Sequence, residues 1–343
     1  MKKLVGLFVV LVLVAGSGAY VLYRRAYEPF QAYRSEQIIE IASGAGTSAI
    51  GRNLIGAGVV RDDLTFRVAL WLSGSARRLQ AGEYRFDRPM SALDVIGKIA
   101  RGEVDLRPLT FPEGLTIAEM ATAFEASGMG TAQAFIQAAK DTSLIREVDP
   151  AARDLEGYLF PDTYALPRRA DASRVVRVMV DRFQQVLSEE LKAAAKARGL
   201  SIRQLLTLAS LVEKETAKPE ERPLVAAVYA NRLRIGMALQ CDPTVIYALQ
   251  QVGKYDGNLR REDLLFDSPY NTYRYAGLPP GPIAAPGKGS LEGAAHPADV
   301  EYIYFVSRND GSHEFARTLD EHNRNVRRYQ VQYFREKRLA GRR

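Results

Sequence analysis

Four glutamates lie within one short segment, residues 208–225, which reads LASLVEKETAKPEERPLV. The segment begins as an apolar helical pattern and is interrupted by Pro219. A carboxyl group beside a buried helix face can have a raised pKa, and an acid that keeps its proton near neutral pH can serve as a general acid. The chemistry that this segment suggests is therefore acid catalysis by one of its glutamates.

Helical geometry narrows the choice to Glu213 and Glu215. Ser201 and Gln204 form a capping-box pattern, so we expect a helix that begins there and ends before Pro219. At about 100° per residue, the two glutamates flank the predicted buried arc on opposite sides. Periodicity alone does not choose between them.

The local surroundings favour Glu215. A helical side chain leans over the residues three and four positions earlier, which here are Leu211 and Val212. Glu215 also lies nearer the negative end of the helix dipole, and both effects raise a carboxyl pKa, although Lys218 acts in the opposite direction. Without further information, two surface glutamates at a helix end are the commoner arrangement.

The following segment predicts a second helix, which ends at Gly236 and has Glu220 and Glu221 in its first turn. This position favours acidic residues through the helix dipole alone. Asp242 precedes Pro243 and is predicted to be the N-cap of a further helix. Three histidines without metal-ligand spacing and a lone cysteine predict no metal site and no disulfide.

The N-terminus predicts a membrane anchor. Residues 4–23 form a run of twenty uncharged residues, which is long enough to span a bilayer, and Arg24 and Arg25 follow directly. A cleaved signal peptide is the alternative, and the apolar residues that continue past AGSGA favour an uncleaved helix. Basic residues on both sides leave its orientation open.

The net charge of +7 comes largely from the C-terminal tail, where residues 324–343 contain eight basic residues and one glutamate. An amphipathic, solvated last helix is favoured over binding to nucleic acid. Along the chain we expect a cytoplasmic tip and transmembrane anchor in residues 1–25 and a stalk in 26–37. A small α/β domain in 38–107 and a helix-rich α+β domain in 108–343 follow. The strand-turn-helix pattern of residues 39–60 recurs in residues 109–129, and the overall fold class is α+β.

Further elements are predicted from local patterns. A helix is expected to be N-capped near Ser91 and closed by Gly102. Helical periodicity also extends over residues 132–140, 172–198 and 201–217, and residues 302–307 predict a strand.

Several ordered motifs together resemble the endolytic murein transglycosylase family, whose members are also described as YceG-like. The motifs are LEGYLFPDTY, LASLVEKET followed by ER, VYANRLRIGMALQCDPTVIYAL, SPYNTYRYAGLPPGPIAAPG, SLEGAAHP and YIYFVSR. They cover nearly the whole chain. The resemblance implies a single-pass anchor in the inner membrane, a small LysM-like domain that binds peptidoglycan, and a periplasmic catalytic domain that cuts glycan strands internally.

The resemblance also implies site residues. The second glutamate of the EKET motif, the family's catalytic acid/base, falls on Glu215. Eight further positions match motif residues and are predicted to bind substrate, namely Glu221, Asn231, Arg232, Gln240, Asp242, Thr244, Asn271 and Tyr273. A lytic transglycosylase can use one carboxyl group twice, because the attacking hydroxyl belongs to the substrate, so neither a cofactor nor a metal is implied.

Two alternatives stay open. A muramidase would need a second carboxylate, for which Asp242 or Glu221 is the candidate. A non-catalytic, membrane-anchored protein that binds peptidoglycan would need only the small domain and the anchor. The family further suggests work beside peptidoglycan synthases, the penicillin-binding proteins.

Overall fold

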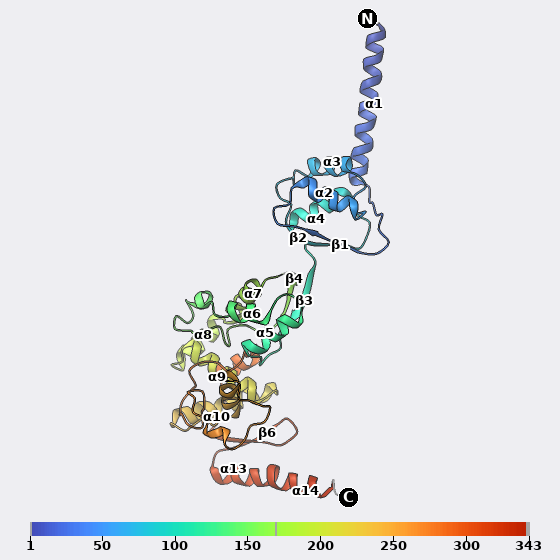
Figure 1. Cartoon of the computed structure of the whole chain (residues 1–343). Helices are drawn as coiled ribbons and strands as arrows, with labels where there is room; N and C mark the ends of the chain where they lie inside the picture. Colours follow the sequence, from blue (N-terminus) through green and yellow to red (C-terminus); the bar gives the residue numbers. More distant parts are fainter. Residues whose placement is uncertain (1, 169, 341–343) are drawn as a thin grey trace. The chain divides into compact units, whose positions relative to one another are not determined.

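The computed structural model describes residues 2–168 and 170–340 of the chain. It divides into two compact units, one of Met1–Pro108 with Ala165–Arg169 and one of Leu109–Tyr164 with Ala170–Arg343. Figure 1 follows the chain through the elements of both units. The fold is a helix-rich mixture of helices and short strands, which agrees with the predicted α+β class.

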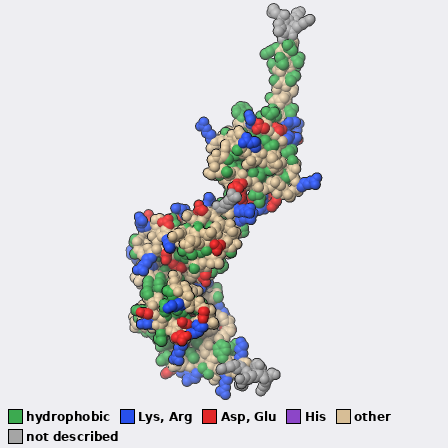
Figure 2. All heavy atoms as spheres, viewed as in Figure 1, with side chains coloured by type: hydrophobic (Ala, Val, Ile, Leu, Met, Phe, Trp, Pro, Cys, Tyr) green, Lys and Arg blue, Asp and Glu red, His purple; other side chains and the backbone are tan. Residues whose placement is uncertain are grey.

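The first helix, α1, runs over Lys2–Tyr27. Its segment Val5–Tyr27 has a mean hydropathy of 2.4 and is long and apolar enough to cross a membrane, as the sequence predicted. Figure 2 shows apolar side chains along this helix. The helix continues into the first unit, because Ala26, near its end, is fully buried in that unit's core.

The rest of the first unit places two strands and three helices around one apolar core. Strands β1 and β2 pair antiparallel, with Ile39 opposite Tyr84. Both of these side chains are buried, so alternate residues of the strands face the core. The elements in chain order are β1 (Gln37–Ile41), α2 (Thr47–Gly56), α3 (Asp63–Ser73), β2 (Gly82–Phe86) and α4 (Ala92–Arg101).

Residues 26–37, which we expected to form a stalk, are packed onto the first unit. Phe30 forms a β-bridge with Met90. The backbone N–H of Ala32 donates to the carbonyl of Gly58 (2.9 Å), and the Tyr33 hydroxyl donates to the carbonyl of Arg88 (2.8 Å). The composition of this segment resembles a linker, but long-range hydrogen bonds fix it to the surface of the unit.

The second unit begins with a strand, a turn and a helix, as the recurring pattern of residues 109–129 predicts. Strand β3 (Leu106–Thr110) pairs with β4 (Thr163–Pro167), and both strands have residues in each unit. Helix α5 (Ile117–Ala126) follows β3. The long helix predicted over residues 172–198 is two helices, because Ser188 accepts a hydrogen bond from the N–H of Leu191 and starts a new helix. The remaining helices of the unit are α6 (Ala132–Ala138), α7 (Ala172–Val186), α8 (Glu189–Ala197), α9 (Ile202–Glu215), α10 (Arg222–Arg234), α11 (Asp242–Gln251), α12 (Lys288–Ala295), α13 (Leu319–Val326) and α14 (Tyr333–Ala340).

Two short segments complete this unit. Strands β5 (Tyr304–Ser307) and β6 (His313–Ala316) form an antiparallel hairpin near the predicted strand at residues 302–307. Between α13 and α14, Arg327–Gln332 is π-helical, and the helical conformation continues through this segment from Leu319 to Ala340.

A buried carboxyl joins three segments of the second unit. Glu156, in the LEGYLFPDTY motif, accepts hydrogen bonds from the N–H of Ile117 (3.1 Å) and the hydroxyl of Tyr247 (3.3 Å). Ile117 begins α5 and Tyr247 lies in α11. Burial, reinforced by the nearby charge of Asp154, raises the pKa of Glu156 to about 8 despite the hydrogen bonds that lower it. The carboxyl is therefore mostly protonated at neutral pH.

Candidate active site

Glu215 is the last residue of α9, and its surroundings are set by how that helix packs. The capping box of Ser201 and Gln204 that the sequence predicted is present at the start of the helix. Every residue of 205–212 is buried, so the middle of α9 is covered on all sides, where we expected one buried arc. The hydroxyls of Thr207 and Ser210 tolerate this burial because they donate to carbonyls of the same helix.

The Glu215 carboxyl meets two buried hydrogen-bond donors. The hydroxyl of Tyr229, on α10, donates to its Oε1 atom at 2.8 Å. The thiol of Cys241, directly before α11, is hydrogen-bonded to the same carboxyl group. Burial raises the pKa of Glu215, and this effect outweighs the two hydrogen bonds, which lower it. Glu215 as a whole residue is of intermediate exposure, and its carboxyl group holds its proton to a higher pH than usual.

Asp242, which is exposed, and Tyr273, which is partly buried, lie near this group. The negative charge of Asp242 adds to the raised pKa of Glu215, whereas His313 lowers it. The hydroxyl of Tyr273 donates to Oδ1 of Asp242 at 2.5 Å. Asp242 is the first residue of α11, and Cys241 is its N-cap, so the predicted capping role of Asp242 is wrong.

This arrangement predicts opposite pH shifts for two substitutions. Activity that needs protonated Glu215 falls as the pH rises through its pKa. Tyr229→Phe removes a hydrogen bond that lowers this pKa, so the alkaline limb of the pH profile should move to higher pH. Asp242→Asn removes a charge that raises it, so the limb should move to lower pH. The rate of the glycan cleavage that the family resemblance implies, followed across a pH series, measures both shifts. Shifts in one common direction would contradict the assignment.

The carboxylate of Glu213, unlike that of Glu215, is engaged by a backbone N–H and an arginine. Its carboxylate accepts a hydrogen bond from the N–H of Gly287 (2.9 Å) and lies 3.5 Å from Nη2 of Arg222. Arg222 also pairs with Glu113 at 3.2 Å. The side chain of Glu213 is only 7% exposed, so Glu213 holds α9 to the loop before α12 and has no free oxygen turned to solvent.

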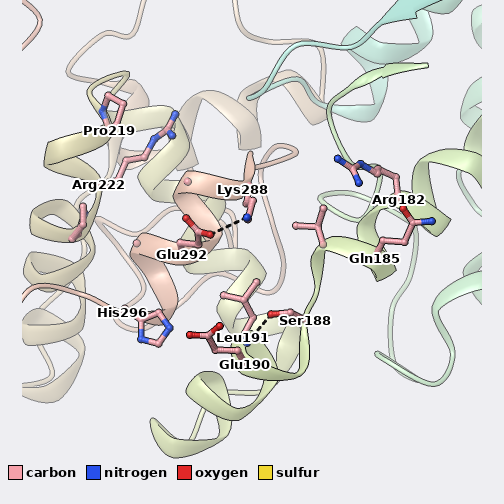
Figure 3. A pocket seen from close by; sticks show the side chains of 14 residues that line it. Arg182, Gln185, Ser188, Glu190, Leu191, Pro219, Arg222, Lys288, Glu292 and His296 are labelled. Atoms are coloured by element: carbon pink, nitrogen blue, oxygen red, sulfur yellow. Dashed lines mark hydrogen bonds and ion pairs between the residues drawn. The ribbon is translucent and has the colours of Figure 1, made fainter. Parts of the chain in front are cut away.

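A cavity of about 780 Å³ in the second unit lies beside Arg222 (Figure 3). Side chains of both charges line it, including His296 and the ion pair between Lys288 and Glu292 (3.4 Å). Neither Glu215 nor any of the predicted substrate-binding residues is among its lining residues. This cavity is therefore not the place where the candidate acid Glu215 lies.

Glu221 connects the end of α9 to the β5–β6 hairpin. Its carboxylate accepts hydrogen bonds from the N–H of His313 (2.8 Å) and the hydroxyl of Thr216 (3.0 Å), and lies 2.7 Å from Nδ1 of His313. Burial alone would raise the pKa of Glu221, but these hydrogen bonds outweigh it and hold the pKa below its usual value. Glu221 thus positions the chain on either side of the site.

We expect Glu221→Ala to lower the free energy of unfolding at neutral pH by about 2 kcal/mol, because buried donors lose their acceptor. A lowered pKa stabilises the fold above the ordinary pKa of a glutamate, and that contribution disappears as the pH falls through the lowered value. The difference in unfolding free energy between the wild type and Glu221→Ala should therefore become smaller at acidic pH. Urea unfolding at neutral and acidic pH tests this, with the exposed neighbour Glu220→Ala as control. A difference in unfolding free energy that does not change with pH would contradict this stabilising role of the Glu221 carboxylate.

Four of the predicted substrate-binding residues are buried or partly buried and bind backbone groups. The amide of Asn231 donates to the carbonyls of Val300 (2.8 Å) and Tyr302 (3.0 Å). Arg232, Thr244 and Asn271 likewise hydrogen-bond to backbone carbonyls, of Ile303 and Leu239, of Cys241, and of Leu264 and Phe266, respectively. These side chains fix the loops around the site.

Gln240 is the predicted residue most free to meet a ligand. It is exposed and has a φ of +50°, a left-handed backbone conformation that is uncommon for residues other than glycine. Its N–H donates to the carbonyl of Thr272 at 3.2 Å. This contact holds the turn between Gln240 and Asp242, with the Cys241 thiol turned inwards and its neighbours outwards.

Sequence reasoning missed Tyr229 and His313. Tyr229 lies in an apolar stretch of α10, between Val228 and Ala230. A tyrosine predicted to be buried in such a stretch needs a partner for its hydroxyl, and this signal could have identified it. His313 belongs to a hairpin distant in sequence, and no local pattern connects it to Glu221.

A carboxylic acid with a raised pKa, supported by a tyrosine hydroxyl and a thiol, is the arrangement of an acid–base enzyme. The sequence model of the YceG-like family matches residues 39–328. The chain belongs to the YceG-like family.

Curated relatives extend this finding. The chain is 33% identical over 330 residues to the endolytic murein transglycosylase of Bacillus subtilis (strain 168), covering 91% of this chain and 90% of that one. It is 31% identical to the endolytic murein transglycosylase of Streptococcus pneumoniae serotype 2 (strain D39), covering 95% of this chain and 65% of that longer protein. A crystal structure of a YceG-like protein from Listeria monocytogenes is similar with a TM-score of 0.57 and 29% identity, over 85% of this chain and 99% of that one.

Proposed function

We propose that this chain is an endolytic murein transglycosylase, which cleaves the β-1,4 bond between N-acetylmuramic acid and N-acetylglucosamine within glycan strands. The observation that carries the proposal is the Glu215 carboxyl, which accepts a hydrogen bond from Tyr229 and whose pKa is raised by burial. The relatives' shared activity, at 31–33% identity over most of the chain, supports the same reaction.

The reaction uses Glu215 twice. As an acid, Glu215 gives its proton to the glycosidic oxygen, and the bond from that oxygen to C1 of the muramic acid breaks. The C6 hydroxyl of the same sugar then attacks C1, and its proton passes to the Glu215 carboxylate, which closes a 1,6-anhydro ring and restores the acid. The Tyr229 hydroxyl stabilises the carboxylate between these steps, since a hydrogen bond to a charged acceptor is strong. No water is consumed.

Gln240, Asp242 and Tyr273 are the side chains that we propose to contact the sugars directly. Gln240 and Asp242 are exposed, and Tyr273 is hydrogen-bonded to Asp242. The negative charge of Asp242 close to Glu215 would also favour positive charge developing at C1. Asn231, Arg232, Thr244 and Asn271 support these contacts through the loops that they hold, and Glu221 does so through His313.

The other parts of the chain fit a wall-cleaving enzyme held at a membrane. We propose that α1 is a single-pass anchor in the inner membrane, that residues 38–107 form a LysM-like unit that binds peptidoglycan, and that the catalytic unit, residues 108–343, lies in the periplasm. Cleavage there would end the elongation of nascent strands beside peptidoglycan synthases. The length and hydropathy of α1 support the anchor, and the separate core of the first unit supports an independent binding function.

Mass analysis of fragments tests the reaction. Purified sacculi treated with the full-length protein should release internal fragments with 1,6-anhydro ends, which lack one water relative to reducing ends. Reducing ends would instead indicate a muramidase, with Asp242 as the remaining second carboxylate, since Glu221 is fully engaged by His313 and Thr216. An absence of fragments would indicate a binding protein.

A further inference from the structure

Helix α3 presents an apolar face to the outside of the first unit. Leu64 and Trp71 are seven residues apart and therefore lie on one side of the helix, with Val68 between them. Their exposed fractions are 60% and 80%, whereas Phe66 and Ala69 on the opposite side are buried in the core. Trp71 is the only tryptophan of the chain, and an exposed tryptophan beside other apolar residues marks a binding surface.

This face is continuous with the end of α1. A hollow of about 450 Å³ lies between the two helices, and all of its lining residues are apolar or aromatic. Helix α1 contributes Ala19, Tyr20, Leu22 and Tyr23, and α3 contributes Val68, Trp71 and Leu72. Trp71 and the last apolar residues of α1 therefore form one surface.

The position of this hollow along α1 places it at the surface of a membrane that α1 would span. The apolar run of residues 4–23 extends for about 30 Å at helical rise, which equals the thickness of the hydrocarbon core of a bilayer. A bilayer spanned by α1 would therefore end near Tyr20 and Tyr23. Tyrosine and tryptophan concentrate at this boundary, where their rings meet both lipid and water.

The charges on α3 do not oppose contact with lipid. Asp63 pairs with Arg67 at 2.7 Å, and Asp62 pairs with Arg25 of α1 at 3.7 Å. Each acidic side chain next to the apolar face is thus matched by a basic one. The face carries no excess negative charge that an anionic membrane surface would repel.

We propose that the face of α3 formed by Leu64, Val68 and Trp71 docks on the membrane surface, with the Trp71 ring between the headgroups and the first part of the acyl chains. The first unit is then held flat on the bilayer at the point where α1 leaves it. This proposal rests on the proposed anchoring by α1, and its occupant is the lipid itself.

Trp71 fluorescence in the full-length protein tests the proposal. The protein is reconstituted in vesicles of phosphatidylethanolamine and phosphatidylglycerol. We expect blue-shifted emission, stronger quenching by lipids brominated near the headgroup end of the acyl chain than by lipids brominated near the methyl end, and several-fold weaker quenching by aqueous acrylamide than in the control. Leu64→Gln, which keeps the fluorophore, should reduce the quenching by lipid.

The control moves the tryptophan to the other side of the same unit. Ile38 lies on β1, on the side of the unit opposite to α3 (Figure 1), and is 38% exposed. In the double variant Trp71→Phe/Ile38→Trp, the fluorophore should be open to acrylamide and insensitive to brominated lipid. A washing step in alkaline carbonate shows separately whether α1 anchors the protein.

The outcomes separate the two ideas. A protein that resists the wash but whose Trp71 is open to acrylamide and not quenched by lipid keeps its anchor and overturns the docking. Protection from acrylamide without quenching by lipid would assign the face to a protein partner, such as a second copy, and also overturns it. Release by the wash overturns the anchor and the docking with it.

Discussion

Glu215→Gln is expected to reduce the release of anhydro-ended fragments by roughly 100- to 10,000-fold, the usual contribution of a general acid and base. Glutamine preserves the shape of the side chain and still accepts the hydrogen bond from Tyr229, but it has no acidic proton to give. The fold should therefore survive. The measurement is the initial rate of fragment release from purified sacculi, followed by mass spectrometry, together with a far-UV circular dichroism spectrum.

Glu213→Gln is the matched control, because it makes the same change two residues away on the same helix. Its carboxylate lies against Gly287 and Arg222, so we expect an effect on stability and unchanged chemistry of the products. If Glu215→Gln still yields anhydro ends at the normal rate while Glu213→Gln does not, the catalytic assignment moves to Glu213.

Glu156→Gln is expected to change how stability depends on pH. The pKa of Glu156 is raised from 4.5 to about 8 in the folded protein, chiefly by burial. A raised pKa favours the fold below the unfolded-state value, and this contribution is lost as the pH rises from about 4.5 to about 8. The loss is on the order of 5 kcal/mol for the whole shift. A glutamine does not titrate, so the variant should keep its stability where the wild type loses it.

The two units allow an internal comparison in this experiment. Trp71 reports unfolding of the first unit, whereas the circular dichroism signal includes the many helices of the second unit, which contains Glu156. The difference between the proteins should appear in the circular dichroism transition and not in the fluorescence transition. Glu220→Gln, at an exposed position, controls for the loss of a charge. An unchanged pH dependence in Glu156→Gln would show that the buried carboxyl is not the titrating group.

Local sequence patterns correctly predicted helix starts and helix ends, because these depend on residues that are close together in the sequence. The caps at Ser91 and Ser201 are present, and Gly102 has the left-handed φ of +69° that a helix end requires. These features arise within one turn of helix. For the same reason the apolar helix α1 and the start of α9 could be located without a structure.

The choice between Glu213 and Glu215 depends on residues that are distant in sequence. Gly287 lies 74 residues after Glu213, and Tyr229 lies 14 residues after Glu215. Helical periodicity places both carboxyl groups beside a buried arc and cannot show which one meets a backbone N–H and which one meets a tyrosine hydroxyl. The preference for Glu215 came from its apolar neighbours and from the family motif.

The structure has neither the predicted stalk at residues 26–37 nor the predicted continuous helix over residues 172–198. In both places specific hydrogen bonds decide the conformation. Residues 26–37 are fixed by contacts to Gly58, Arg88 and Met90, which composition does not reveal. The helix is divided at Ser188, whose capping hydrogen bond competes with a continuous helical pattern that its neighbours would otherwise permit.

The thiol beside Glu215 also bears on the redox behaviour of the protein. Cys241 is the only cysteine and is buried, and burial together with the charge of Glu215 raises the pKa of its thiol well above the usual value. The thiolate is the form that attacks disulfides and reacts with oxidants, and very little of this form is present at neutral pH. A thiol buried in this way would let the chain carry an unpaired cysteine beside its proposed catalytic acid in an oxidising compartment with little cross-linking or oxidation at that position.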